Sequence, residues 1–507
     1  MFFWLLATPL AAVASRHWYV EQTHPNATDR GNGTEATPFA TINAAARVAY
    51  PGDVVVVGTG TYRERVSPAR GGTPGNPITY TAAPGAHPAI RGSEEVPAAR
   101  WTAVSNASSM ATFRLELDPI WFDDVDGGLF NPYAIRLGWP GNESVLPPYG
   151  GCCKLGWSLG QVFQTGLLLT ELPPEEATHN PNPLPPNSWR TAGNGTAIIA
   201  RFNGAGARRT LQGQLPEGVE ITTRKNVFAP QRRGLGWITV RGFTLEHAAT
   251  QWDDAFWVPR RQPHNPSRAA FAQSGMLSPR SGHCWRIENN TLRHSKTIAM
   301  DIGDEGGFDP EGDQPTPYYV GNHTVQFNRL VDNGGKAITG SFGSIRGPEP
   351  LRLQQQQPQR RRPRDGEEGD GGAPRPRPQT RPRGYGEQPC PDCSVHKNHG
   401  GRIAYNIIAG NNYLSCHAAE NAAIKTHGFS GEVVGNLVID NYQSVGMWFD
   451  DLWYDIRVSR NIIVAHRDND WGGIMLEIST GPVRVVRVVR VAVSRKPASC
   501  RESARGH

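Results

Sequence analysis

The chain has 507 residues, among them 57 Gly and 42 Pro, and a formal net charge of +6. Residues 352–383 and 483–507 carry net charges of +5 and +6, so the rest of the chain carries −5. Because the excess of positive over negative charge lies in these two segments, the composition argues against a nucleic-acid-binding surface on the folded part. The Gly and Pro content is typical of a turn-rich all-β chain.

The first 14 residues predict a signal peptide. Met1–Ala14 is apolar and closes on the small residues Ala12-Val13-Ala14, directly before Arg16. A membrane span needs about 20 apolar residues, so a signal anchor is the weaker alternative, and no later segment is long and apolar enough to span a bilayer. We therefore expect a secreted, extracellular protein with no membrane association beyond the signal peptide.

Seven Asn-x-Ser/Thr sequons support secretion, because such sites become glycosylated surface loops in secreted eukaryotic chains. The predicted glycosylation sites are Asn26, Asn32, Asn106, Asn142, Asn194, Asn289 and Asn322. Seven cysteines are few for this length, so disulfides do not build the scaffold. Cys390 and Cys393 are spaced as in a zinc knuckle, but no second CxxC pair follows, and we expect no metal site.

Residues 15–98 predict the beginning of a solenoid. Residues 38–46 form a candidate helix that would cap its open end, and a buried strand follows at 53–57. Solenoids need such a cap because an unpaired edge strand aggregates. Residues 99–230 are rich in Trp, Pro and Gly and predict a β-rich or irregular insertion.

A repeated pattern of strand, Asn and strand indicates the fold. It recurs at Asn290, Asn328, Asn406, Asn436 and Asn461, and the last two are 25 residues apart, close to one rung of a β-helix. Asn tolerates the left-handed backbone of a tight corner and can hydrogen-bond to the Asn of the next rung. We therefore predict an all-β, right-handed parallel β-helix in which these Asn side chains are structural.

The remaining segments interrupt or end this pattern. Residues 346–389 are rich in Arg, Pro and Gln and predict a disordered insertion. After Pro482 the repeated Val-Arg pattern resembles neither a rung nor a cap, which suggests a truncated or frame-altered end. We divide the chain into a signal peptide (1–14), a cap with the first rungs (15–98), the insertion (99–230), further rungs (231–345), the disordered insertion (346–389), rungs with the site (390–482) and a basic tail (483–507).

Several segments together point to a family. They are residues 38–64, 227–230, 237–243, 248–252, 420–427, 446–450 and 477–482. On these segments the chain resembles pectin-lyase-like β-helix proteins related to glycoside hydrolases of the α-L-fucosidase and xylanase group. The resemblance covers about residues 15–98 and 217–482, and implies a carbohydrate-active protein. Asp451 departs from it, standing where an aromatic residue is expected, and Thr480 stands where a His is common.

The sequences of two predicted strands late in the chain align with each other and suggest a catalytic pair. Residues 446–450 and 473–477 are offset by 27 residues, about one rung, so Asp450 and Glu477 should lie side by side. Neighbouring strands are about 4.8 Å apart. Retaining glycosidases hold their two carboxyl groups roughly 5–5.5 Å apart and inverting ones roughly 6.5–9.5 Å apart. The register therefore permits a carboxylate pair of either kind.

Other residues gather around this pair. Lys425 precedes Asp450 by 25 residues and is predicted to join the same column, where such groups would shift each other's pKa values. Asp301 is a candidate for an equivalent position further up the solenoid. The other candidate substrate-binding residues are His427, Asp451, Trp448, Trp453 and Trp471, the three Trp as sugar-stacking platforms. The alternative is a solvated face of salt bridges, with Trp448 packing and His427 structural.

Three functions follow from these residues. The first is a glycoside hydrolase that uses Asp450 and Glu477, needs no cofactor and cleaves an extracellular or cell-wall polysaccharide. The second is a polysaccharide lyase in which Lys425 is the base and Asp450, Asp451 or Glu477 hold Ca²⁺. The third is a non-catalytic glycan-binding or surface protein. In each case we expect a monomer whose partner is a polysaccharide. The fold hosts the first two chemistries, so it does not decide between them.

Overall fold

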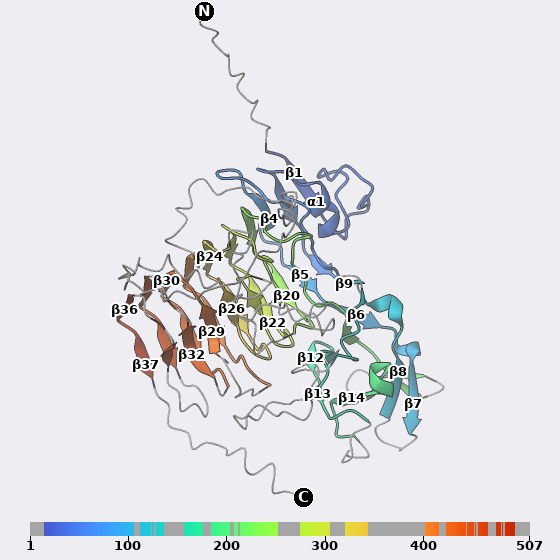
Figure 1. Cartoon of the computed structure of the whole chain (residues 1–507). Coiled ribbons are helices and arrows are strands. Elements are labelled where there is room, and N and C mark those ends of the chain that lie inside the picture. The colour runs from blue at the N-terminus through green and yellow to red at the C-terminus, as the bar shows by residue number, and fades with distance from the viewer. Residues whose placement is uncertain are drawn as a thin grey trace, which may run out of the picture.

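The computed structural model is built almost entirely of short β-strands (Figure 1). It describes residues 15–105, 112–122, 124–125, 128–135, 157–175, 184–202, 207–210, 213–251, 274–304, 320–342, 401–414, 422–442, 444–450, 452, 455–464, 473–477, 479 and 482–491. In that part of the chain, no helix is both long and apolar enough to cross a membrane.

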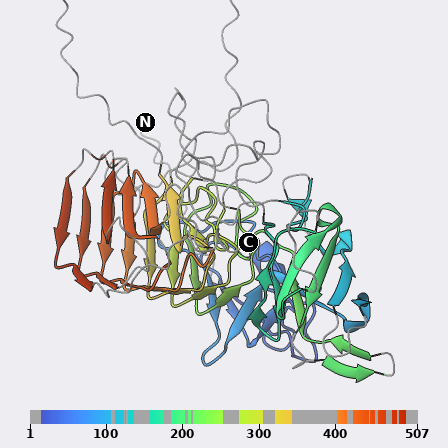
Figure 2. The same ribbon diagram turned by 90° about the horizontal axis from the view of Figure 1, so that it is seen from below.

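Three parallel sheets form the body, and in the later rungs the chain visits each of them once per rung. The first sheet consists of β1 (His17–Val20), β2 (Val54–Val57), β4 (Ile78–Ala82), β19 (Ile238–Arg241), β21 (Arg286–Glu288), β24 (His323–Gln326), β27 (Gly401–Ala404), β30 (Gly431–Val434), β33 (Ile456–Ser459) and β36 (Val483–Val486). The second consists of β3 (Gly60–Tyr62), β5 (Pro88–Arg91), β20 (Thr244–Glu246), β22 (Thr291–Arg293), β25 (Arg329–Val331), β28 (Ile407–Ala409), β31 (Leu437–Ile439), β34 (Ile462–Val464) and β37 (Val489–Val491). The third consists of β23 (Met300–Asp301), β26 (Ile338–Ser341), β29 (Ala422–His427), β32 (Val445–Asp450) and β35 (Ile474–Glu477). Figure 2 shows these strands stacked along one axis, which is the predicted β-helix.

Apolar side chains stack in register along the inside of this helix. In the first sheet Val325, Ile403, Val433 and Val458 follow one another on neighbouring strands, and all are fully buried. Because side chains alternate between the two faces of a strand, the residues between them point outward. The core is therefore a continuous apolar column, and chemistry is left to the outer faces.

Asparagine ladders fix the corners between sheets. Asn290, Asn328, Asn406, Asn436 and Asn461 form one buried ladder, in which the side-chain carbonyl of each later Asn accepts hydrogen bonds from the backbone N–H and the side-chain amide of the Asn before it. A second ladder joins Asn333, Asn411 and Asn441. The predicted structural role of these residues is confirmed.

The left-handed residue at the first corner is not the one expected from the sequence. Positive φ angles occur one position earlier, at Asn289, Phe327, Tyr405, Gly435 and Arg460, with φ between 55° and 68°. The ladder Asn therefore does not have to adopt the left-handed conformation. It stabilises the corner through its side-chain amide, which donates and accepts hydrogen bonds at the same time.

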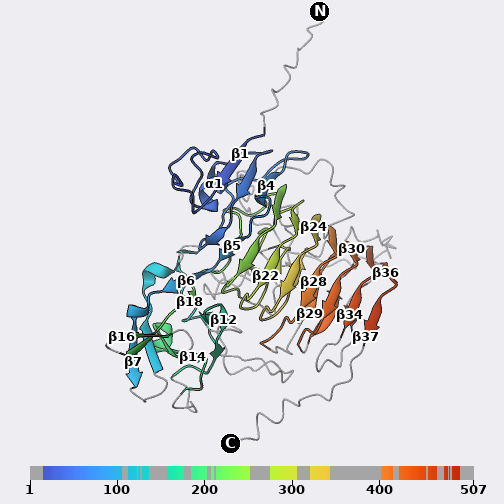
Figure 3. The same ribbon diagram turned by 180° about the vertical axis from the view of Figure 1, so that it is seen from behind.

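Helix α1 (Ile42–Val48) begins inside the predicted segment 38–46. The Thr41 hydroxyl accepts a hydrogen bond from the Ala44 N–H at the helix start. Ile42, Ala44, Ala45 and Ala46 are buried, and the helix packs beside β1 and β2 (Figure 3). Its role as a cap of the open end stays a prediction.

The insertion is a separate, mainly antiparallel body beside the early rungs (Figures 1 and 3). One sheet consists of β6 (Ser93–Val96), β18 (Val219–Thr222), β11 (Val162–Gln164) and β12 (Leu167–Leu168). The other consists of β13 (Thr170–Glu171), β14 (Ser188–Ala192), β15 (Ala197–Arg201), β8 (Thr112–Glu116) and β7 (Trp101–Ser105). The small pairs are β9 (Asp124–Val125) with β10 (Gly128–Leu129) and β16 (Ala207–Thr210) with β17 (Gly213–Pro216), and the 3-10 helices are η1 (Ala98–Arg100), η2 (Pro119–Trp121) and η3 (Gly193–Gly195). Because β6 pairs with β18, the body spans about residues 93–222 rather than the predicted 99–230.

The predicted tail is wrong at its beginning. β36 and β37 continue the first two sheets by pairing with β33 and β34, so residues 483–491 form another rung. The Val-Arg repeat has a period of three residues, so Arg484 and Arg490 fall inside the two strands and Arg487 falls at the corner between them, in the left-handed conformation with φ 53°. Val488 then stands where the ladder has Asn in the preceding rungs.

Several predictions fall outside the described residues. They concern the signal peptide 1–14, the insertion 346–389, the sequons at Asn106 and Asn142, and the residues Asp451, Trp453, Trp471 and Thr480. Of the other sequons, Asn26, Asn32, Asn194 and Asn289 are exposed and Asn322 is half-buried. Cys284 is a buried thiol, and burial raises its pKa to about 11.

Candidate active site

The outer face of the third sheet carries two columns of chemically reactive residues. In the Asp450 column, His427, Asp450 and Glu477 pair across β29, β32 and β35. The inward neighbours Met447 and Phe449 are fully buried in the core, which forces Asp450 to the other face. Asp450 and Glu477 therefore lie on neighbouring strands in the register that their 27-residue offset predicts.

The Lys425 column lies beside it. Asp301, Thr339, Lys425, Trp448 and Met475 are paired from strand to strand along the sheet. The sequence predicted Lys425 in line with Asp450, but the register sets His427 opposite Asp450 and Lys425 opposite Trp448. The structure pairs β29 with β32 at an offset of 23 residues, whereas Lys425 precedes Asp450 by 25. It pairs β32 with β35 at an offset of 27, so the offset of one rung cannot be carried over to the other.

Lys425 reaches Asp450 diagonally. Its Nζ donates to Asp450 Oδ2 at 2.9 Å, and both side chains are almost completely buried. The same Nζ lies 3.8 Å from the centroid of the Trp448 ring, a cation–π contact. Carboxylate and ring both stabilise the charged ammonium, and they hold the Lys425 side chain in one place.

Trp448 is part of this support. Only 7% of the residue is exposed, and it packs with Ala422, Val445 and Met475. One ring face already holds the Lys425 ammonium. This geometry does not match the sugar-stacking platform expected from the sequence, and we assign Trp448 to positioning Lys425.

His427 completes the cluster as a neutral ring. Its Nε2 lies 3.6 Å from Asp450 Oδ2. Burial and the positive charges of Lys425 and Lys336 lower the pKa of His427 well below its usual 6.5, despite the opposing effect of Asp450. At neutral pH the imidazole is therefore uncharged and supplies a donor or an acceptor without adding charge.

Glu477 has a different environment from Asp450. It is half-buried at the end of β35, whereas Asp450 is only 3% exposed. Two neighbouring carboxyl groups in unlike surroundings are the arrangement that separates an acid from a base or nucleophile. The site thus presents one buried carboxylate held by a cation beside a second carboxyl that is half-buried.

Asp301 lies apart from the pair. It pairs with Thr339, which pairs with Lys425, so the two strands β26 and β29 separate it from β32, the strand that holds Asp450. Its Oδ1 accepts a hydrogen bond from the Gly303 N–H at 3.1 Å. The structure therefore does not bring Asp301 to the carboxylate pair.

Comparisons with known proteins agree with this architecture. A structure of XylC with xylose superposes with a TM-score of 0.62 and 24% identity, covering 92% of this chain and 65% of that one. A second solved structure, titled as a glycoside hydrolase, gives a TM-score of 0.45 and 10% identity over 94% of this chain and 96% of that one. The chain has the pectin-lyase-like parallel β-helix fold.

Sequence comparison adds little to the structural match. No family model matches the chain. The uncharacterized protein YwoF of Bacillus subtilis is 39% identical over 56 residues, which is 11% of this chain and 12% of that protein. The chain spans 65% of the length of the XylC structure and 12% of YwoF.

Not every residue of this site was predicted from the sequence. Thr339 and Ser341 of β26 pair with Lys425 and His427, and both are buried on the same face. Lys336 is buried as well and acts on the charge of His427. The sequence contains a signal for Thr339 and Ser341, because residues 337–341 (Ala-Ile-Thr-Gly-Ser) align with residues 423–427 (Ala-Ile-Lys-Thr-His).

Calcium does not fit the described part of this site well. Asp450 Oδ2 already contacts the Lys425 ammonium, which a Ca²⁺ would have to displace. Elsewhere in the described residues, Glu246, His247 and His294 are close enough to share a metal ion. Both Glu246 oxygens, however, contact guanidinium groups, of Arg91 at 2.5 Å and Arg293 at 2.6 Å, so we assign this cluster to an ion-pair network.

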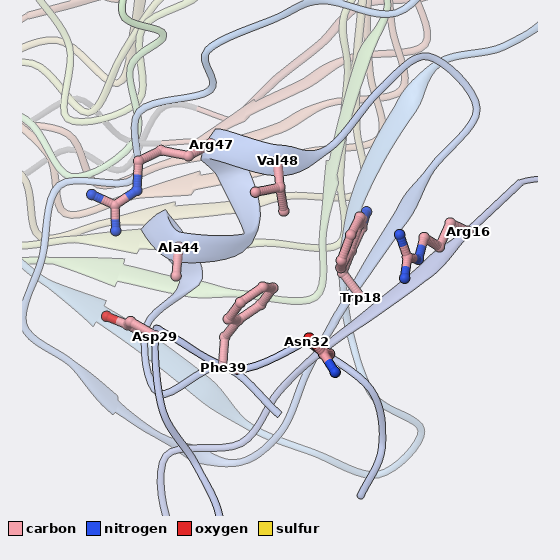
Figure 4. A pocket seen from close by; sticks show the side chains of 9 residues that line it. Arg16, Trp18, Asp29, Asn32, Phe39, Ala44, Arg47 and Val48 are labelled. Carbon is pink, nitrogen blue, oxygen red and sulfur yellow. The ribbon is translucent and has the colours of Figure 1, made fainter. Parts of the chain in front are cut away.

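A separate hollow of about 480 Å³ lies at the N-terminal end of the β-helix (Figure 4). Trp18 and Phe39 line it but are 8% and 3% exposed, and Trp18 Nε1 donates to Asp53 Oδ2. Asp29 accepts from the backbone N–H groups of Ala40 and Thr41. The polar groups of this hollow thus hold the local fold together, and it shares no lining residue with the Asp450 column.

Proposed function

We propose that this protein is a secreted glycoside hydrolase that cleaves an extracellular or cell-wall polysaccharide, with Asp450 and Glu477 as its carboxylate pair. The observation that carries the proposal is the position of Glu477 next to Asp450, which Lys425 holds at 2.9 Å. The Lys425 ammonium pairs with the Asp450 carboxylate and orients it. Asp450 is then the nucleophile, and Glu477 is the acid that protonates the leaving oxygen and later the base that activates water.

The strand register favours retention of configuration. Neighbouring strands are about 4.8 Å apart, closer to the roughly 5–5.5 Å of retaining glycosidases than to the wider spacing of inverting ones. His427, neutral and beside Asp450, would orient that carboxylate or a sugar hydroxyl without competing for the charge. Ser341, its neighbour on β26, lines the same face.

The lyase alternative is less well supported. It requires the Lys425 amine to be free to take a proton from the substrate, yet its Nζ already contacts the Asp450 carboxylate and the Trp448 ring. It also requires calcium near Asp450, where Lys425 already stands. We therefore propose a reaction that needs no metal.

An activity screen tests the proposal. The full chain is incubated with a panel of neutral and acidic polysaccharides, with and without EDTA, and new reducing ends and unsaturated uronates are both measured. We expect reducing ends without unsaturated products, unaffected by EDTA and lost in Asp450→Asn and Glu477→Gln. Calcium-dependent unsaturated products would establish the lyase. Binding without turnover by a folded chain would establish a glycan-binding protein.

A further inference from the structure

A small cavity lies where the antiparallel insertion meets the β-helix. Its volume is about 130 Å³, and Gly160, Gln161, Glu171 and Trp189 line it from the insertion. Lys296 and Tyr413 close it from corners of the β-helix. Lys296 and Tyr413 do not belong to the Asp450 column or the Lys425 column. Tyr413 shortly precedes β29, the strand that carries Lys425.

The walls of this cavity are held in place firmly. Lys296 Nζ contacts Glu171 Oε2 at 2.5 Å, and both side chains are almost fully buried. Gln161 Nε2 donates to the Tyr413 hydroxyl at 2.8 Å. An apolar cluster of Phe130, Leu159, Ala249 and Leu414 also joins the two bodies. The cavity is therefore a fixed feature of the junction.

Two residues of the cavity lining each carry a buried polar atom without a hydrogen-bond partner among the described residues. Gln161 Oε1 and Trp189 Nε1 make no hydrogen bond within the described part of the chain, and both residues are 1% exposed. Buried polar groups are normally satisfied, so each of these unpartnered atoms calls for an explanation such as a bound ligand or water. A hydroxyl group can satisfy either atom, because it donates and accepts.

Size and charge restrict the ligand further. At about 30 Å³ per water molecule the volume exceeds that of a single water, yet it is below the roughly 300 Å³ of typical drug-sized sites. Lys296 and Glu171 neutralise each other, so the lining gives no net attraction to an anion. Trp157, Trp189 and Tyr413 supply flat apolar surfaces of the kind that pack against sugar rings.

We propose that this junction cavity binds one neutral sugar residue, either a free monosaccharide or the end of a chain. The inference rests on the proposed carbohydrate function but not on catalysis. Gln161 Oε1 accepts a hydrogen bond from a sugar hydroxyl, and Trp189 Nε1 donates one. The insertion then contributes a sugar-binding wall to the β-helix.

Ligand-observed NMR and calorimetry on the full-length Asp450→Asn chain test this proposal without turnover. The probes are xylose, glucose and galactose, with glucuronate as the charged comparison and short neutral oligosaccharides to distinguish a free sugar from a chain end. We expect saturable binding of at least one neutral sugar and at least tenfold weaker binding of glucuronate.

Matched variants locate the binding. Trp189→Phe and Gln161→Leu should each weaken it at least tenfold. Trp101→Phe is the control, because Trp101 Nε1 is also buried without a partner among the described residues but does not line the cavity. Unchanged binding in the first two variants, when both unfold cooperatively like the parent, or no saturable binding of any neutral sugar would overturn the proposal. An inactive wild-type chain that still binds would refute only the proposed hydrolase.

Discussion

Lys425 and Asp450 form a buried ion pair between neighbouring strands, with Nζ 2.9 Å from Oδ2 and almost no exposure of either side chain. The pair lies on the outer face of a solenoid, where most side chains could be solvated. Taking two charges out of water is costly, and buried ion pairs are weak evidence for stability. We therefore interpret this one as part of a functional site.

Removing one member of the pair should destabilise the fold. Lys425→Met leaves the Asp450 charge buried without its cation, and we expect a loss of about 3–5 kcal/mol in the free energy of unfolding, measured with urea. The double variant Lys425→Met/Asp450→Leu should recover much of this loss. The exposed pair Arg114 and Glu116 is the control, and Arg114→Met should cost less than about 1 kcal/mol. Equal effects at both pairs would contradict the account.

Azide rescue should separate the roles of the two carboxylates. In Glu477→Ala the rate should fall about 10²–10⁴-fold, and azide should restore turnover and give a glycosyl azide with the anomeric configuration of the substrate. In Asp450→Ala azide takes the place of the nucleophile and gives the opposite configuration. NMR of the two glycosyl azides determines the anomeric configuration of each. The reverse pattern would exchange the two assignments.

Stability should fall on mild acidification. The pKa of His427 is lowered in the fold, so below about pH 6.5 the unfolded chain binds more protons than the native one, and the free energy of unfolding decreases as the pH falls. Burial lowers the pKa of His294 to about 4 and that of His323 to about 3, with the same sign. Between pH 6.5 and 5, urea titrations should show a shallower dependence for His427→Gln than for the parent chain. The exposed His17→Gln is the control, and an unchanged slope in His427→Gln would contradict the lowered pKa.

Two neighbouring corner residues, Arg460 and Asn461, should differ in how much their substitution changes stability. Asn461→Ala removes the acceptor of the Asn436 backbone N–H and side-chain amide, and should cost at least about 2 kcal/mol, since each orphaned buried group costs roughly 1–3 kcal/mol. Arg460, directly before it, has φ 57°, which glycine adopts without strain. Arg460→Gly should change stability by less than about 1 kcal/mol in the same urea assay. A larger loss for Arg460→Gly than for Asn461→Ala would refute this division of roles.

Much of the fold could be predicted because its signals are local. Each rung of the solenoid repeats an apolar alternation and an Asn at a corner, and both features are visible in a few neighbouring residues. The insertion could not be predicted in detail, since β6 and β18 pair across more than a hundred intervening residues. The last rung was missed because Val488 replaces the ladder Asn that marks its predecessors.

The candidate site was predictable only where rung length is regular. Asp450 and Glu477 follow from one 27-residue offset between strands of similar sequence. The pairing of His427 with Asp450 depends on the strand register, which differs by two residues from the one expected from the sequence. Ser341 and Thr339 could be found only from the similarity of residues 337–341 to residues 423–427, because the long segment between β26 and β29 makes their offset much larger than one rung.

The most direct test of the central claim is the source of oxygen in the new end of the product. Cleavage of an accepted polysaccharide is run in water enriched in oxygen-18 with EDTA present, and the products are analysed by mass spectrometry. The hydrolase account predicts one heavy oxygen in each new reducing end, with no product from Asp450→Asn or Glu477→Gln. Unsaturated products without heavy oxygen, formed only when calcium replaces EDTA, would contradict it.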